Sequence, residues 1–193
     1  MHKTEKWLFS PSLAGKSRSK KIAYIAVMTA LCVLANTFFE FKFAQTQFSL
    51  TLVFSALTGI LIGPTFGFAA CFLGDLVGFL YHSSGYPYMP WIGLSMGFTA
   101  FLSGVLTGVW QPNCKGSLFL RLTAVCISSF LLCTVAINTT AFWILYAKGV
   151  PYGTYLVSRL FVQGQIWNSI FNYGLLFISV PALTKVKAFG IIL

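Results

Sequence analysis

Six long apolar stretches separated by short polar segments dominate the chain. They cover residues 22–39, 48–62, 66–81, 91–110, 118–146 and 160–183. A helix that crosses the hydrocarbon core of a membrane needs about 20 mostly apolar residues, so each stretch is a candidate span. The pattern predicts an all-α integral membrane protein in which six transmembrane helices form one bundle. The stretch at 118–146 is longer than one span needs, so its ends extend beyond the hydrocarbon or its helix is tilted.

The boundary between the second and third stretches decides the number of spans. It reads Gly63-Pro64, and a proline disfavours helical geometry in the residue before it. A tight turn is therefore expected rather than a kinked helix, which makes six spans rather than five. The first stretch, 22–39, is as long as a span and follows a basic segment longer than the charged region of a secretory signal. We expect it to be an uncleaved first span.

Lysine and arginine are unevenly distributed between the two ends of the predicted spans. If both termini are cytoplasmic, ten of the 13 Lys and Arg lie on the cytoplasmic side and three lie outside. The positive-inside rule therefore favours cytoplasmic N and C termini. The chain divides into a basic tail at 1–21, a six-helix membrane domain at 22–187 and a C-terminal tail at 188–193.

Composition supports the membrane prediction and removes several other classes. Hydrophobic residues make up 57% of the 193 positions and charged residues only 8%, whereas soluble domains carry about 25% charged residues. The net charge of +10 is typical of contact with nucleic acid or with anionic lipid. Because six cations precede residue 22 and no phosphate-binding loop follows, we expect membrane lipid as the partner and no nucleic acid. The 5 cysteines show no metal-ligand spacing, so no metal site is predicted.

Few polar side chains lie inside the predicted spans, and these are candidates for function. Asp75 is the one acidic residue within a span, and a carboxylate there nearly always faces protein or a water-filled cavity. Two interpretations stay open for it: a ligand contact, or a structural hydrogen bond to Asn or Ser on another helix. Asn138, Asn168 and Asn172 are further candidates, and Asn168 and Asn172 share a helix face, with Gln165 one turn earlier. Their amides suit a heterocycle that donates and accepts hydrogen bonds, and bonds between helices are the alternative.

The three predicted outer loops, 40–47, 82–90 and 147–159, are long and rich in aromatic residues. Long loops on one face of a bundle are typical of a lid or a binding surface. The aromatic candidates, with a histidine among them, are Tyr81, His82, Tyr86, Tyr88, Trp91 and Trp143. They either stack on a flat ligand or form the interfacial aromatic belt of a membrane protein. A planar guanidinium pairs well with carboxylates, so Arg159, with Lys42 and Lys148, is a candidate to attract an anionic part of the ligand. Anchoring of a helix end is the alternative for each of the three.

Several motifs carry a resemblance to a known family. They are FSLTLVF at 48–54, LTGILIGPTFG at 57–67, LGDLVG at 73–78, SGYPY at 84–88 and WIGLSMGFTAFLSG at 91–104. In this order they resemble the substrate-binding S component of energy-coupling-factor (ECF) vitamin transporters, and most of all its folate-specific branch. The resemblance is strongest over residues 21–110.

That resemblance implies a six-helix bundle that captures a vitamin, folate in this branch, from outside the cell and delivers it inwards. It implies a bacterial plasma-membrane location and two kinds of protein partner, a transmembrane coupling subunit and two ATP-binding-cassette ATPases. The ATPases use the ATP, and no cofactor is expected on this chain. The family's Ala-x-x-x-Ala contact with the coupling subunit maps to Ala26 and Ala30. The first outer loop acts as a lid, which places Lys42 and Gln47 among the candidate ligand contacts.

Alternatives from other classes stay open at this point. The sequence has no nucleotide-binding loop, no paired carboxylates within the spans and no nucleophile motif, so an enzyme, including an ATPase, is disfavoured. A channel would need a polar stripe, for which only scattered Asn and Gln are present. A structural membrane protein fits the composition but leaves Asp75 and the aromatic loops without a role. Another vitamin, or a nucleobase-like precursor, is the alternative ligand for an S component.

Overall fold

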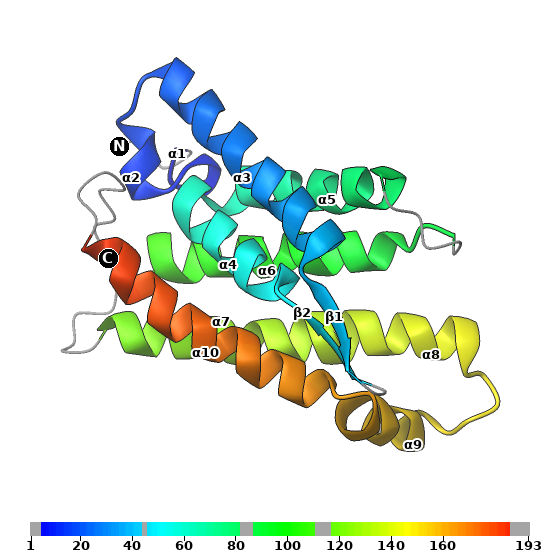
Figure 1. Ribbon diagram of the computed structural model, residues 1–193. Helices are drawn as coiled ribbons and strands as arrows, with labels where there is room; N and C mark the ends of the chain where they lie inside the picture. The colour runs from blue at the N-terminus through cyan, green and yellow to red at the C-terminus, as the bar shows by residue number, and fades with distance from the viewer. Residues whose placement is uncertain (1–4, 44–45, 82–86, 111–116, 186–193) are drawn as a thin grey trace.

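The computed structural model describes residues 5–43, 46–81, 87–110 and 117–185. Within them the chain is a bundle of helices with one short hairpin (Figure 1). Five helical runs are long and apolar enough to cross a membrane: α3 (Arg18–Phe38), α5 (Pro64–Tyr81), α6 (Pro90–Gly108), the run Ser117–Tyr146, and α10 (Gln165–Thr184). The apolar helix α4 (Thr51–Ile62) is shorter. All six predicted stretches thus contain helix, while the six-span count and the cytoplasmic termini stay predictions.

A turn of one residue joins α4 to α5, and this confirms the interpretation of Gly63-Pro64. Gly63 has a φ of 123°, a backbone conformation that residues with a side chain rarely adopt and that glycine tolerates. Its N–H donates to the carbonyl of Gly59. Pro64 then begins α5, where the N–H that proline lacks would have had no partner within the helix.

The basic N-terminal segment is partly folded. It contains two short helices, α1 (Glu5–Leu8) and α2 (Pro11–Ala14). Ser10, between them, donates its N–H to the Ile62 carbonyl at 2.7 Å, and Leu13 is buried in the bundle. Because α3 already begins at Arg18, the last basic residues of this segment form the first turn of the helix.

Residues between α3 and α4 form a two-stranded antiparallel hairpin that the sequence analysis did not predict. β1 (Glu40–Phe43) pairs with β2 (Thr46–Ser49). The prediction of helix from residue 48 is therefore wrong at its first residues, since α4 begins at Thr51. Alternating aromatic residues favour strands, but strands of 4 residues are too short for a period of two to stand out beside an apolar stretch.

The run Ser117–Tyr146 is continuous helix, although it is longer than a membrane span needs. Its two ends are α7 (Ser117–Ser129) and α8 (Thr140–Tyr146). A π-helical segment, η1 (Phe130–Thr139), joins them. Such segments are frequent at functional sites, and η1 contributes side chains to the cavity described in the next subsection.

The predicted span at 160–183 is wrong at its start. A short helix, α9 (Tyr152–Val157), continues into a π-helical turn, η2 (Ser158–Val162). Gly164 then adopts a left-handed conformation with a φ of 72°, and α10 begins at Gln165. The apolar character of 160–162 had joined η2 to the span, because hydropathy does not register the change of direction that a single glycine permits.

The bundle packs around α4, in which 8 of the 12 residues are buried. A Cβ on Gly59 would overlap the Ala100 carbonyl oxygen, and one on Gly104 would lie 2.9 Å from the Gly59 carbonyl oxygen. Small residues therefore let α4 and α6 approach closely. By contrast, Ala26 and Ala30 lie on the exposed face of α3, so the bundle itself does not use them for packing.

Candidate functional site

A cavity of about 200 Å³ lies beside the end of β2, η2 and the start of α10. Residues of α3, β2, α4, α6, η1, α8, η2 and α10 line it. Its main polar members are Asn36, Ser55, Ser95, Asn138, Arg159 and Asn168. Pockets that combine apolar walls with a few converging polar groups are typical of small-molecule sites.

Three buried polar atoms of this lining have no hydrogen-bond partner within the part of the chain that the structure describes. They are Ser55 Oγ, Asn138 Oδ1 and Arg159 Nε. Buried polar atoms are nearly always paired, and an unpaired one costs about 1–3 kcal/mol. Asn138 does use its amide nitrogen, which donates to Ser95 Oγ at 3.0 Å. The unpaired hydroxyl, carbonyl and guanidinium N–H together offer both donors and acceptors to a ligand.

Arg159 places a cation at this cavity. Its guanidinium carbon lies 4.1 Å from the centre of the Phe142 ring, which is a cation–π contact. Its Nη1 donates long hydrogen bonds to Tyr155 (3.5 Å) and Gln163 (3.4 Å). Burial lowers the pKa of Arg159 and Tyr155 opposes that shift, but a guanidinium stays protonated. Asp75, the one carboxylate among the described side chains, is bonded elsewhere, so Arg159 is suited to pair with an anion.

Asn168 and Asn172 of α10 form hydrogen bonds with the backbone where β2 leads into α4. Asn172 is fully buried, and its amide nitrogen donates to the Ser49 carbonyl at 2.7 Å while its oxygen accepts from the Val53 N–H at 3.1 Å. Asn168 accepts from the Ser49 N–H at 3.0 Å. Gln165 and Asn168 line the cavity, whereas Asn172 lies behind it. The contacts of Asn172 are those of a structural bond between elements.

Asp75 lies one layer away from the cavity. It is 4% exposed, and its carboxylate accepts from Asn36 Nδ2 at 3.0 Å and from the Tyr88 hydroxyl at 3.1 Å. Burial and the negative charge of Asp75 raise the pKa of Tyr88 to about 12. A Cβ on Gly93 would lie 2.8 Å from the Asp75 carboxylate, so the glycine leaves room for this contact. Asn36 lines the cavity, and Asp75 therefore acts on it through Asn36.

The other predicted aromatic residues lie around the cavity or away from it. Trp91 packs edge-on against Phe142, with ring centres 5.7 Å apart, and its indole nitrogen is buried without a partner among the described residues. Trp143 donates to the Val150 carbonyl at 2.7 Å at the protein surface. Tyr81 is 76% exposed. Trp143 and Tyr81 thus have the positions expected of an interfacial belt.

Four further candidates fall wholly or partly outside the described residues. His82 and Tyr86 lie in the segment 82–86. Lys42 and Gln47 pair with each other across the hairpin, but their side chains are not among those described. Their roles as ligand contacts stay predictions.

Several lining residues were not among the predicted contacts, and Ser55, Ser95 and Phe142 are the main ones. Ser95 and Asn138 come from α6 and η1 and are bonded to each other. A signal for Ser55 and Ser95 is visible in hindsight, because each is a polar side chain inside an apolar stretch, as Asn138 is. Serine is common in helices, however, and only the fold shows that these side chains converge.

The sequence profile described as "ECF-type riboflavin transporter, S component" matches residues 16–185. A crystal structure of FolT bound with folic acid aligns with a TM-score of 0.63 and 20% identity, over 81% of this chain and 92% of that one. An S component of a bacterial ECF transporter aligns with a TM-score of 0.53 and 18% identity, over 88% of this chain and 100% of that one.

Identities this low show a shared fold and leave the ligand open. The search of curated proteins returned no match. The sequence profile, however, covers most of the chain, and it confirms the resemblance on which the sequence analysis relied. The chain belongs to the ECF-type riboflavin transporter S component family.

Proposed function

We propose that this chain is the membrane-embedded, vitamin-binding subunit of an ECF importer in the bacterial plasma membrane. It takes its ligand from outside into the cavity between α3, α6, η1 and α10. A transmembrane coupling subunit and two ATPases then drive release inwards. In Figure 1, α3 begins and α10 ends at the same end of the bundle, which supports an even number of crossings, with α4 as the second of six.

The observation that carries the proposed ligand class is the cation at the cavity. Arg159 has no carboxylate partner among the described side chains, and the buried atoms beside it, Ser55 Oγ and Asn138 Oδ1, are unpaired. A flat heterocycle with donors and acceptors on its edge would pair with the hydroxyl and the amide. An anionic tail would pair with Arg159, stacked on Phe142. Folic acid has both parts, and the fold's likeness to FolT bound with folic acid supports it as the ligand.

Riboflavin is the second candidate, because the matching profile is named for it. Its ring also carries a mixed hydrogen-bonding edge, but its chain is uncharged and would not need Arg159. The volume of about 200 Å³ is below the roughly 300–1,000 Å³ of typical ligand pockets. Either ligand therefore requires the hairpin or the outer segments to move outwards on binding.

The test begins with mass spectrometry of small molecules released from the purified chain, followed by calorimetry with folic acid and with riboflavin. For folic acid, Arg159→Gln is expected to weaken Kd roughly 10- to 100-fold, the value of one charge-assisted hydrogen bond. Lys185→Gln, which removes an exposed cation at the end of α10, away from the cavity lining, is the matched control and is expected to change nothing. Tight riboflavin binding that is unaffected by Arg159→Gln would reject folate and retain the S component.

The coupling partner can be tested separately on the exposed face of α3. Ala26→Leu with Ala30→Leu adds bulk where two helices would meet closely, so we expect the coupling subunit to be lost in co-purification while vitamin affinity is unchanged. Thr123→Leu, an exposed change on α7, is the control. Unchanged co-purification of the double variant would remove this face from the proposed interface.

A further inference from the structure

Two buried cysteines from different helices lie side by side in the core of the bundle. Cys32 of α3 and Cys71 of α5 are both 0% exposed, and their Sγ atoms lie 3.6 Å apart, within hydrogen-bond distance. Both thiols are free. Because a disulfide bond is about 2.05 Å long, the two sulfur atoms need to approach by only about 1.5 Å to form one. The Thr58 hydroxyl oxygen lies 3.3 Å from Cys32 Sγ, so a thiolate on Cys32 would accept hydrogen bonds from Thr58 and from Cys71.

The same register joins α3 to α5 one helical turn further along. The next contact pairs Asn36 with Asp75, which are the residues four positions after the two cysteines, and Asn36 donates to the carboxylate at 3.0 Å. Residues four apart share a helix face, so the two contacts are successive steps of one interface. The helices are close here, because a Cβ on Gly74 would lie 2.8 Å from Cys32 Cβ. A cross-link between the cysteines would therefore act one turn from Asn36, which lines the cavity.

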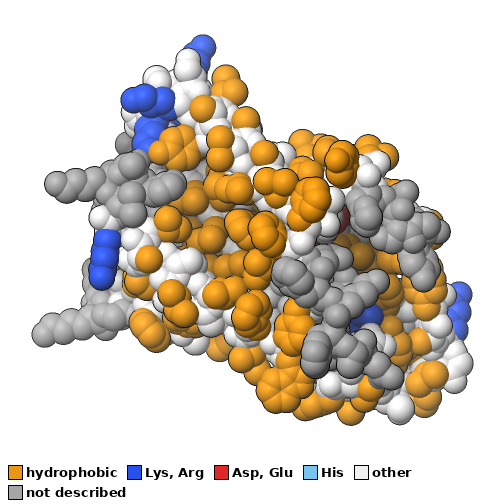
Figure 2. Space-filling view, viewed as in Figure 1, with side chains coloured by type: hydrophobic (Ala, Val, Ile, Leu, Met, Phe, Trp, Pro, Cys, Tyr) orange, Lys and Arg blue, Asp and Glu red, His pale blue; other side chains and the backbone are white. Residues whose placement is uncertain are grey.

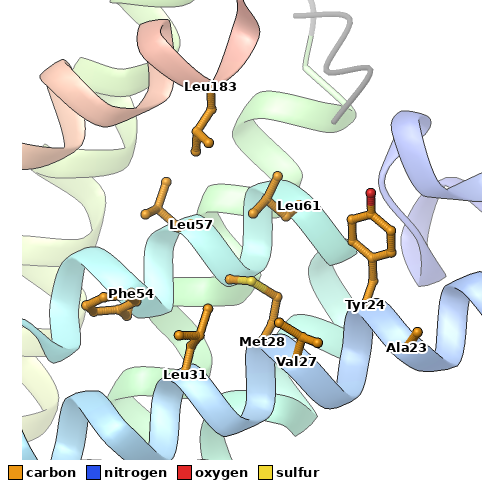
Figure 3. Close-up of a pocket in the computed structure, with 9 residues that line it drawn as sticks. All are labelled: Ala23, Tyr24, Val27, Met28, Leu31, Phe54, Leu57, Leu61 and Leu183. Atoms are coloured by element: carbon orange, nitrogen blue, oxygen red, sulfur yellow. The ribbon is translucent and has the colours of Figure 1, made fainter. Parts of the chain in front are cut away.

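Much of α3 lies at the surface of the bundle. Only 17% of the residues along its apolar stretch are buried, against 39% for α5 and 50% for α6. An apolar groove of about 450 Å³ borders α3 on the side of α4, and Figure 3 shows Met28 and Leu31 pointing into this space. Contacts with α5 thus fix much of the position of α3 in this chain, and a covalent bond to α5 would restrain it further.

The cavity gives a small, neutral oxidant a route to the two thiols. Met96 lines the cavity and packs in the same buried cluster as both cysteines. Ser55 also lines it, and the Ser55 carbonyl oxygen lies 4.0 Å from Cys71 Sγ. Figure 2 shows hydrophobic side chains along much of α3, with cations where this helix begins. Hydrogen peroxide is uncharged and close to water in size, so apolar walls hinder it less than they hinder a charged reagent.

We propose that Cys32 and Cys71 form a redox-sensitive pair, and that their oxidation to a disulfide by a hydroperoxide fixes α3 to α5 and restricts the cavity. The sulfur of one deprotonated thiol attacks a peroxide oxygen, the O–O bond breaks, and a sulfenic acid and one water form. The second thiol attacks this sulfur and releases a second water. Two thiols and one hydrogen peroxide thus give one disulfide and two waters. A sensor cysteine beside a resolving cysteine is a common arrangement for this chemistry.

The effect on ligand binding rests on the proposed function. Ligand entry requires the outer elements to move outwards, and Asn36 lies near the end of α3 that leads into the hairpin. The cross-link holds this wall of the cavity against α5. We therefore expect the oxidised chain to bind the vitamin more weakly, by roughly fivefold or more.

Peptide mass spectrometry of the full chain in detergent, before and after hydrogen peroxide, tests the cross-link. Cys114, which lies outside the described residues, is replaced by serine in every protein so that it forms no disulfide. We expect one disulfide, between Cys32 and Cys71, that a reductant reverses and that raises Tm by roughly 4–16 °C. Cys126 and Cys133 are also buried and are the internal control, expected to stay as thiols.

Cys32→Ala and Cys71→Ala are each expected to abolish the cross-link and the rise in Tm, whereas Cys126→Ala is expected to keep both. Calorimetry with folic acid and riboflavin, before and after peroxide, measures the effect on binding. Two thiols that survive peroxide, or sulfinic acid on single cysteines, would overturn the proposal and leave a packing contact. So would a complete cross-link that leaves Kd unchanged. A reduced chain that binds neither vitamin would instead contradict the proposed function, while the mass and the Tm still test the cross-link.

Discussion

Replacing Asp75 with asparagine tests whether the buried carboxylate holds the ligand end of the bundle in shape. The carboxylate accepts from Asn36 at 3.0 Å and from Tyr88 at 3.1 Å. Asn36 lines the cavity, and Tyr88 belongs to the segment that leads into α6. Asp75 therefore links Asn36, a wall residue of the cavity, to Tyr88 in the segment before α6. Asparagine preserves the shape of the side chain, removes its charge and replaces one acceptor oxygen with a donor NH2 group, which the Tyr88 hydroxyl can still meet as an acceptor.

The size of the effect follows from the two hydrogen bonds. A bond to a charged group contributes about 1.5–3 kcal/mol and a neutral one about 0.5–1.5 kcal/mol, so the change weakens the pair by about 2–3 kcal/mol. The change also removes the desolvation cost of a charge on a side chain that is only 4% exposed, which offsets part of this loss. We expect a net loss of about 1–2 kcal/mol in the free energy of unfolding. For a chain of this size that lowers Tm by about 2–8 °C.

Thermal unfolding in detergent and calorimetry with the vitamin measure the two consequences. Tyr88→Phe removes one of the bonds without touching Asp75. If the carboxylate acts through Tyr88, the double variant loses less than the sum of the single losses, by about 0.5–3 kcal/mol. Additive losses, or an Asp75→Asn protein with the Tm and Kd of the unaltered chain, would refute the idea that this contact shapes the site.

Three further changes probe the same end of the bundle. Gly93→Ala places a Cβ 2.8 Å from the Asp75 carboxylate, whereas Gly153→Ala meets nothing within 4 Å; we expect only the first to lower Tm, and equal values would contradict the crowding. Asn172→Ala leaves the buried groups that it bonds without partners, which costs at least about 2 kcal/mol in thermal unfolding; a neutral result would mean that this junction is loose. The pKa of Tyr88 is raised from 10.0 to about 12, so its protonated form stabilises the fold fully below pH 10 and this contribution fades as the pH approaches 12. Stability measured against pH is expected to fall less over that window in Tyr88→Phe, and identical curves would argue against the shift.

The long apolar helices were predictable because hydropathy over about 20 residues averages out local detail. The turn at Gly63 was predictable for a different reason, since proline disfavours helix in the residue before it and glycine tolerates the positive φ that the turn adopts. The hairpin and the break at Gly164 were missed because both lie beside apolar stretches and are only a few residues long. Hydropathy reports where a segment prefers to lie and is insensitive to the direction of its backbone.

The candidate site was also only partly predictable from the sequence, and Asp75 and Arg159 show why. In the sequence both are charged residues in or beside an apolar stretch, and both are equally good candidates for a ligand contact. In the structure Asp75 has two protein partners, whereas Arg159 has an unpaired Nε, two long hydrogen bonds and an aromatic face. A side chain whose bonds are satisfied within the protein shapes a site, and one that is left unsatisfied at a cavity is suited to bind what enters it. That difference depends on which helices meet, so it makes Arg159→Gln the more direct test of the ligand and Asp75→Asn the test of the scaffold that presents it.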